Sequence, residues 1–192
     1  MPGKKNKDVD CYTISGTAKL KGFVRNGLDS STMINLIVVY DSEFQEYSKR
    51  GFSFPPDLFY YHEISWSEVI GVLMNEHKFA KEEAINSMKE LKSKFNLQEI
   101  KRNENIDEAF ENIVEEANNK VVAKSKNKKL KIGIQDTIII GGFLRGKVNF
   151  IHSGDQGFLK TCEELDINII PLPKKDIEKE NQIKKLMKKG RN

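Results

Sequence analysis

One alternating stretch near the end of the chain limits the possible folds most strongly. A strand pattern at residues 147–152 runs into Ser153-Gly154-Asp155, a short helix pattern follows, and a second strand pattern covers residues 167–170. Two strands joined through a helix favour parallel pairing, because parallel strands need a long crossover connection. This stretch therefore predicts an α/β fold with a parallel sheet.

The rest of the chain continues the alternation of strands and helices. Apolar periodicity predicts a short strand that ends before Asp29, with a helix after it. No internal repeat is visible. The alternating order of strands and helices predicts a parallel sheet sandwiched by helices. The remaining elements expected are strands at residues 58–62 and 97–100, a loop at 42–56, and helices at 65–73, 78–95, 105–124 and from 132 onward.

Four acids occur where such a sheet would collect them. Asp29 follows the first strand pattern and Asp155 follows the strand at 147–152, whereas Glu68 and Asp136 lie near helix starts. In an open α/β sheet, sites form outside the carboxyl ends of the strands. Mg²⁺ and Mn²⁺ prefer oxygen ligands, so clustered carboxylates predict a site for a hard divalent cation.

The acids lie in four local motifs. These are Leu28-Asp29-Ser30-Ser31 through Ile34, Ser65 to Glu68 before an apolar run, Asp136 before Thr137-Ile138-Ile139-Ile140, and Ser153-Gly154-Asp155-Gln156-Gly157-Phe158. Together they resemble a PIN domain, the metal-dependent nuclease domain of VapC-type toxins and RNA-processing enzymes. The resemblance spans roughly residues 23–173. It departs at Gly157, where the usual Thr/Ser-x-Asp-x-Asp-Phe pattern has a second acid.

The resemblance implies a three-layer sandwich, with helices on both faces of the sheet, and a specific activity. The activity would be an endoribonuclease that hydrolyses RNA phosphodiesters with Mg²⁺ or Mn²⁺, either in RNA processing or as a toxin. A bound metal pair can activate water and stabilise the attacking and leaving oxygens. The residues implied as catalytic and metal-binding are Asp29, Glu68, Asp136 and Asp155, with Ser30 and Ser153 in support.

Each acid also has a purely structural interpretation. Ser65 and Glu68 match a capping box, which is compatible with metal binding. Asp29 and Asp155 can cap the helices that follow them, although Ser30 or Ser31 is also suited to cap the first of these helices. Asp136 fits the first turn or the N-cap of its helix.

Basic residues are unevenly distributed. The net charge is +4, and residues 174–192 hold eight basic residues and three acids. Residues 120–131 contain six lysines and no acid. Such runs can bind phosphates without reading sequence, although solvated ends are an equally simple interpretation. The predicted RNA contacts are Lys126, Lys128, Lys129, Lys131 and Arg145.

Composition predicts the compartment and the partners. There are two cysteines and no Cys-x-x-Cys motif, which favours a reducing compartment. No apolar run approaches the ~18 residues of a membrane span, so a soluble cytoplasmic protein is expected. RNA is the predicted partner, with an antitoxin or another protein and a homodimer as further possibilities.

Three segments are expected along the chain. Residues 1–22 form an N-terminal extension, residues 23–173 form the PIN-like nuclease domain, and residues 174–192 form the basic tail. The resemblance to a PIN domain does not explain the N-terminal extension.

Two other functions stay open. A catalytically silent PIN-like module that binds RNA or a protein is favoured by Gly157 and by the weak first strand, which contains Asn26 and Gly27. Another α/β phosphate-handling enzyme is disfavoured because no Gly-rich phosphate loop is present. A dehalogenase-type phosphatase would also need an acid at Ser31.

Overall fold

The computed structural model describes residues 24–38 and 58–172. The predicted N-terminal extension, the loop at 42–56 and the basic tail lie outside these ranges. Within the described ranges, no helix is long and apolar enough to cross a membrane.

The described strands form one parallel sheet in the order β3-β2-β1-β4-β5. The strands are β1 (Arg25–Leu28), β2 (Leu58–His62), β3 (Gln98–Ile100), β4 (Phe150–Ser153) and β5 (Asn168–Pro171). From β1 the chain adds strands on one side, then crosses to the other side at β4. The sheet therefore has its topological switch point between β1 and β4, where open α/β sheets place ligands.

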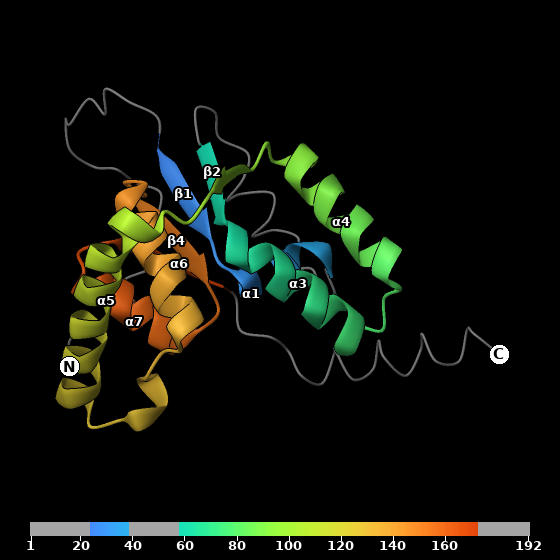
Figure 1. Ribbon diagram of the computed structural model, residues 1–192. Helices are drawn as coiled ribbons and strands as arrows, with labels where there is room; N and C mark the ends of the chain where they lie inside the picture. The colour runs from blue at the N-terminus through green and yellow to red at the C-terminus, as the bar shows by residue number, and fades with distance from the viewer. Residues whose placement is uncertain (1–23, 39–57, 173–192) are drawn as a thin grey trace, which may run out of the picture.

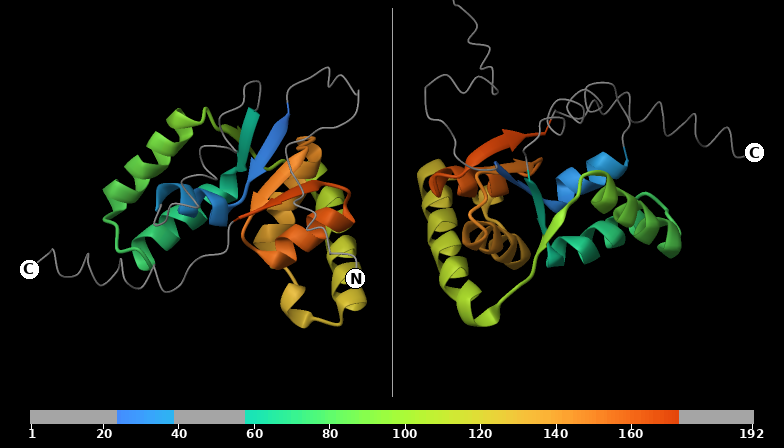
Figure 2. Two further views of the ribbon diagram at one scale, coloured as in Figure 1. Left: turned by 180° about the vertical axis from the view of Figure 1, so that it is seen from behind. Right: turned by 90° about the horizontal axis from the view of Figure 1, so that it is seen from above.

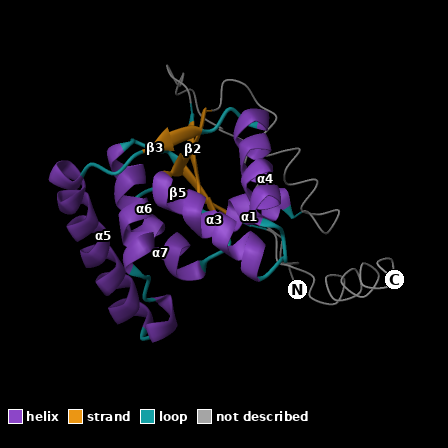
Figure 3. Cartoon of the chain, turned by 45° about the vertical axis from the view of Figure 1, so that its right-hand side comes forward, coloured by secondary structure: helices purple, strands orange, loops and turns teal. Residues whose placement is uncertain are grey.

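Two groups of helices cover the two faces of this sheet (Figures 1, 2 and 3). One face carries α1 (Ser30–Ile37), α3 (Glu63–Asn75) and α4 (Lys81–Lys94). The other carries α5 (Glu104–Ser125), α6 (Ile134–Arg145) and α7 (Gln156–Glu164), with the short 3-10 helix η1 (Lys128–Leu130) between α5 and α6. The predicted three-layer parallel α/β fold is confirmed.

Alternating side chains of the strands supply two separate cores. Phe59 and Tyr61 of β2 are buried in the core shared with α1, α3 and α4. Tyr60, between them in sequence, packs with Ile100 and Ile151 in the core shared with α5, α6 and α7. Both faces of the sheet are thus buried, as parallel sheets require.

Two residues of the first strand, Asn26 and Gly27, serve close packing and a buried polar contact. A Cβ atom at Gly27 would lie 2.8 Å from Ile151 Cδ1 and 3.2 Å from Phe143 Cδ2, so only glycine fits there without displacement. Asn26 is buried, and its Oδ1 lies 3.1 Å from Nε2 of the buried His152. The two residues that weaken β1 as a sequence pattern are therefore accounted for by the neighbouring strand and by α6.

Several predicted boundaries differ from the structure by one to three residues, and two of them have clear local reasons. Helix α3 begins at Glu63 rather than Ser65, because His62 at the end of β2 is the N-cap and its Nδ1 accepts from Ile64 N at 3.3 Å. The predicted Ser65–Glu68 capping box is thus absent. Strand β4 begins at Phe150 rather than Lys147, because Lys147 has a φ of 52° and still belongs to the turn after α6.

The packing around Gly27 gives a direct test of the fold. Gly27→Ala should lower the free energy of unfolding by about 1–3 kcal/mol, because the added methyl overpacks the core. Gly71→Ala on α3 is the matched control, since a Cβ there meets nothing within 4 Å. The control should stabilise the protein by about 0.5–1 kcal/mol through helix propensity. Urea denaturation measures both, and equal effects would contradict the described packing.

Candidate active site

Two acids follow the neighbouring strands at the switch point. Asp29 follows β1 and Asp155 follows β4, and the register pairs Leu28 with His152. The two connections are tied together, since Asp29 N and Thr32 Oγ1 both donate to His152 O, at 3.3 Å and 2.7 Å. The carboxyl edge of β1 and β4 is therefore one rigid corner.

Asp29 lies inside this corner and is only 5% exposed. Its carboxylate accepts hydrogen bonds from Ser153 Oγ, from Ser31 Oγ at 2.9 and 3.0 Å, and from Thr32 N at 2.8 Å. The last of these makes Asp29 the N-cap of α1, so the predicted cap at Ser30 or Ser31 was wrong. Asp29 takes this role because it has extended backbone angles directly before the first helical residue.

Burial raises the pKa of Asp29 from 3.8 to about 6. The hydrogen bonds from Ser153, Thr32 N and Ser31 favour the ionised form and oppose this shift in pKa. Near neutral pH, Asp29 is therefore an ionised carboxylate in a site that disfavours negative charge.

Ser153 links this carboxylate to the second acid. Its hydroxyl donates to Asp29 Oδ2 and accepts from Asp155 N at 3.0 Å. Asp155 in turn caps α7, with Phe158 N donating to Oδ1 at 2.7 Å. The structural capping role of Asp155 is confirmed, and its other carboxylate oxygen has no hydrogen bond from the described residues.

Glu68 reaches the site from α3 on the opposite face of the sheet. The buried Ser30 donates from Oγ to Glu68 Oε2 at 2.6 Å. Since Ser30 follows Asp29 directly in sequence, this hydrogen bond ties Glu68 to the residue next to the buried carboxylate. Glu68 caps no helix, and within the described residues its hydrogen bond is this contact with Ser30.

Asp136 completes the group from α6. It lies in the first turn, and its Oδ2 accepts from Gly133 N at 3.1 Å. Its pKa is raised, first by burial and then by the negative charges of Asp155 and Glu68, while the Gly133 hydrogen bond opposes the rise. Asp136 is therefore within electrostatic reach of both acids, although they come from different helices.

The four acids share one electrostatic property. Among the residues that the structure describes, none of them forms an ion pair with lysine, arginine or histidine. Their partners are hydroxyls and backbone N–H groups. The negative charges of Asp155 and Glu68 act on Asp136 with no cation to balance them, and a divalent ion is the kind of ligand that relieves such repulsion.

The donor chemistry suits Mg²⁺ or Mn²⁺, which take hard oxygen ligands. Glu68 Oε1, Asp136 Oδ1 and Asp155 Oδ2 accept no hydrogen bond from the described part of the chain, so one oxygen of each is available. With the side chains as they stand, however, no group of three or more acidic, histidine or cysteine side chains within that part is arranged to hold a metal ion.

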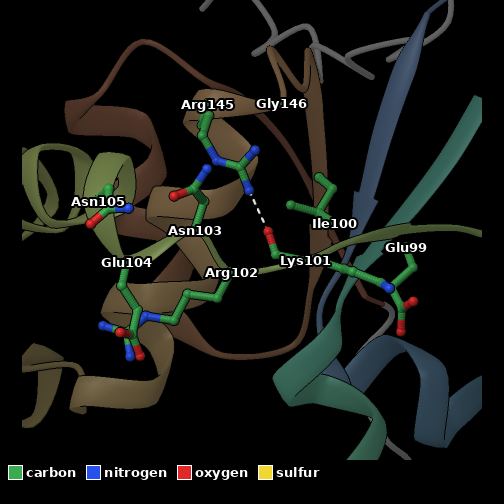
Figure 4. Close-up of a pocket in the computed structure, with 9 residues that line it drawn as sticks. All are labelled: Glu99, Ile100, Lys101, Arg102, Asn103, Glu104, Asn105, Arg145 and Gly146. Atoms are coloured by element: carbon green, nitrogen blue, oxygen red, sulfur yellow. Dashed lines mark hydrogen bonds between the residues drawn. The ribbon is translucent and has the colours of Figure 1, made fainter.

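The predicted basic residues divide between the two ends of α6. Lys126, Lys128, Lys129 and Lys131 are exposed in the connection that leads into the helix. Arg145 lies nine residues beyond Asp136, about 14 Å along the helix axis. It pairs with Asp107 at 2.5 Å. It also donates to Lys101 O at 2.5 Å, as Figure 4 shows.

Arg145 borders a separate pocket of about 690 Å³, lined mainly by residues 99–105. Because Arg145 is held by Asp107 and Lys101 there, the structure does not group it with the lysines. Its predicted contact with RNA stays a prediction.

Two hydroxyls that organise the corner were missed in the sequence. Ser31 Oγ contacts Asp29 and accepts from Gly154 N at 2.9 Å, which joins α1 to the loop after β4. Thr32 Oγ1 bonds to the end of β4. The signal was the run Ser30-Ser31-Thr32 directly after Asp29, because three consecutive hydroxyls are more than one helix cap requires.

The strand order and the layers define a PIN-like α/β fold. No family model matches the chain, and no curated protein matches it in sequence. The chain is similar in structure to DNA-bound VapBC from Salmonella typhimurium, with a TM-score of 0.51 and 14% identity over 79% of this chain and 100% of that chain. It is similar to VapBC2 from Rickettsia felis bound to a promoter DNA fragment, with a TM-score of 0.50 and 12% identity over 78% and 100%.

The raised pKa of Asp29 predicts a pH-dependent stability. Because the folded pKa, about 6, exceeds the unfolded value of 3.8, the folded state binds more protons between these values. Without divalent ions, the free energy of unfolding should fall by up to about 3 kcal/mol as pH rises from 4 to 7. Asp29→Asn keeps a capping oxygen and should remove this fall.

Denaturation at a series of pH values measures the effect, with the exposed Glu108→Gln on α5 as the control. A wild-type profile that matches that of Asp29→Asn would show that Asp29 carries no buried charge.

Proposed function

We propose that the protein is a divalent-metal-dependent endoribonuclease that hydrolyses RNA phosphodiesters. The observation that carries the proposal is the group of four acids at the switch point, held by hydroxyls and backbone N–H groups without a cationic partner. A buried, uncompensated carboxylate such as Asp29 costs stability, and a bound cation would offset that cost. The PIN-like fold supports the same assignment.

Asp29, Asp136 and Asp155 would hold Mg²⁺ or Mn²⁺, with Glu68 bound directly or through water. The ion would supply an activated water and stabilise the charge that develops on the phosphodiester oxygens. Binding requires the carboxylates to turn toward one another. Ser30 and Ser153 would keep Glu68 and Asp29 in place during this rearrangement, because each hydroxyl already contacts one of them.

Two biological settings are compatible with the proposed activity. The structures that this chain resembles are of VapBC bound to DNA. A toxin role with an antitoxin as the protein partner is one setting, and RNA processing is the other. A homodimer is compatible with both.

A catalytically silent module is the competing function. It is favoured by one observation, that no three described side chains are arranged to hold an ion as they stand. Metal binding separates the two functions. A silent module needs no cation for stability, whereas a working centre gains stability when the ion removes the repulsion among its acids.

Metal-dependent unfolding tests the proposal. At Mn²⁺ 100-fold above its Kd, the wild-type unfolding midpoint should rise by about 5–10 °C, since binding contributes about 2.7 kcal/mol. Asp136→Asn keeps an oxygen for Gly133 N but loses a ligand charge, so most of the rise should vanish. Glu104→Gln, an exposed acid in the first turn of α5, should behave as wild type.

Cleavage of a labelled single-stranded RNA in Mn²⁺ completes this test. Asp136→Asn should cleave at least ~100-fold more slowly than wild type, because one lost metal-binding or charge-stabilising group typically costs this much. Unchanged cleavage in that variant would contradict the proposed metal centre. So would a wild-type unfolding midpoint that does not change with Mn²⁺.

A further inference from the structure

The connection between α5 and α6, residues 126–131, is a short basic turn, here called the lysine turn. Lys126 ends α5 with a φ of 54°, and η1 follows at once. All four lysines of the turn are exposed, and the turn contains no acid. In Figure 1 it lies at the bottom of the view, where α6 begins. The turn therefore leads directly into the helix that carries Asp136.

A buried amide fastens this turn to the domain. Asn118 of α5 is 3% exposed, and its Nδ2 donates to Leu130 O and to Thr161 Oγ1, both at 2.9 Å. Its Oδ1 accepts from Ile132 N at 3.3 Å. One side chain thus holds the turn at both sides of Lys131 and joins it to α7. A turn that served only as a solvated linker would need no such buried attachment.

The turn also explains why residue 157 is glycine. A Cβ atom there would lie 2.9 Å from Leu130 O and 3.2 Å from Asp155 Oδ1. Any side chain at this position would therefore begin against a carbonyl oxygen of the turn and against the carboxylate of Asp155. The position where the PIN pattern has a further acid is therefore covered by the lysine turn, which lies directly beside Asp155.

The four ammonium groups of the turn have no ion pair within the described ranges. The nearby Lys124 and Lys160 differ, because they pair with Glu164 at 2.7 Å and with Glu163 at 2.6 Å. Available cations thus lie on the turn that packs against Gly157, two residues beyond Asp155, and that leads into the helix of Asp136. Carboxylates repel an approaching phosphate, so a site for nucleic acid gains from cations that attract the strand to its border.

We propose that the lysine turn is the arm of the site that binds the backbone of the RNA strand, through phosphates next to the one that is cleaved, and that Asn118 is its positioning residue. This inference rests on the proposed function for the identity of the strand. Lysines are compact point charges, so the arm binds phosphates without selecting bases. At the position where the PIN pattern has a further acid, the lysine turn presents cations instead. The border of the site therefore attracts RNA phosphates rather than repelling them.

Binding without cleavage gives the first test. Anisotropy of a labelled single-stranded RNA is measured against salt concentration, with the whole chain in EDTA. The double variant Lys128→Ala with Lys129→Ala should bind on the order of 10-fold more weakly at low salt, and the slope of log K against log salt should fall by about 1.4. Lys81→Ala with Lys89→Ala, two exposed lysines of α4, removes the same charge on the other face of the sheet and should leave both quantities unchanged.

Asn118→Asp tests the positioning role. It keeps the size of the side chain but loses the donor to Leu130 O, so the salt slope should fall as in the lysine variant while the Mn²⁺-dependent rise in the unfolding midpoint persists. Asn118→Ala, which removes both the donor and the acceptor without adding a charge, should give the same separation if Asn118→Asp does not fold. A purely structural role would lower stability without changing the salt slope.

The outcomes separate this inference from the proposed function. In Mn²⁺, the turn variants should raise KM for RNA about 10-fold with little change in kcat. If wild type cleaves RNA and the turn variants bind and cleave as the α4 control does, the RNA-binding role of the lysine turn is refuted. The proposed nuclease activity is then unaffected. A second outcome is that the wild-type protein neither cleaves RNA nor is stabilised by Mn²⁺, while the turn variants lose RNA binding. The proposed nuclease activity is then refuted and the RNA-binding role of the lysine turn is supported. A loss confined to duplex DNA would overturn the assignment to RNA.

Discussion

The hydrogen bond from Ser153 to the buried carboxylate of Asp29 is the contact on which the rest of the site depends. It joins the ends of β1 and β4, the two strands between which the sheet reverses its order. Through the same hydroxyl, the backbone of Asp155 is held in place. A sheet edge fixed in this way can hold charged groups close together, because their repulsion acts against a rigid frame rather than a mobile loop.

The same acids serve the fold and, in our proposal, the chemistry. Asp29 and Asp155 cap helices, and Asp136 sits in a first turn, so each contributes to local stability. The burial of Asp29 and Asp136, and the negative charges of Asp155 and Glu68 near Asp136, act in the opposite direction. The raised pKa of Asp29 shows that desolvation outweighs the hydrogen bonds it accepts. Helix capping explains one oxygen of Asp136 and one of Asp155, and leaves the other oxygen of each for a ligand.

More of the fold than of the site could be predicted from the sequence. Apolar periodicity was enough for the order of strands and helices, because each face of a parallel sheet must be buried. The start of α3 was missed because the cap is His62, which is also the buried last residue of β2. The role of Gly157 could not be read from its neighbours, because the atom that excludes a side chain there belongs to Leu130, far away in sequence. The grouping of Asp136 with Glu68 likewise depends on helices from opposite faces of the sheet.

Anomalous diffraction from crystals of the whole protein soaked in Mn²⁺ tests the central claim most directly. We expect a manganese peak at the carboxyl edge between β1 and β4, within about 2.0–2.6 Å of oxygens from Asp29, Asp136 and Asp155, with Glu68 as a direct or water-mediated partner. A fully soaked crystal with no peak at this edge, in which Asp136 and Asp155 keep only their capping contacts, would contradict the claim. The four acids would then be structural residues of a PIN-like domain without a metal centre.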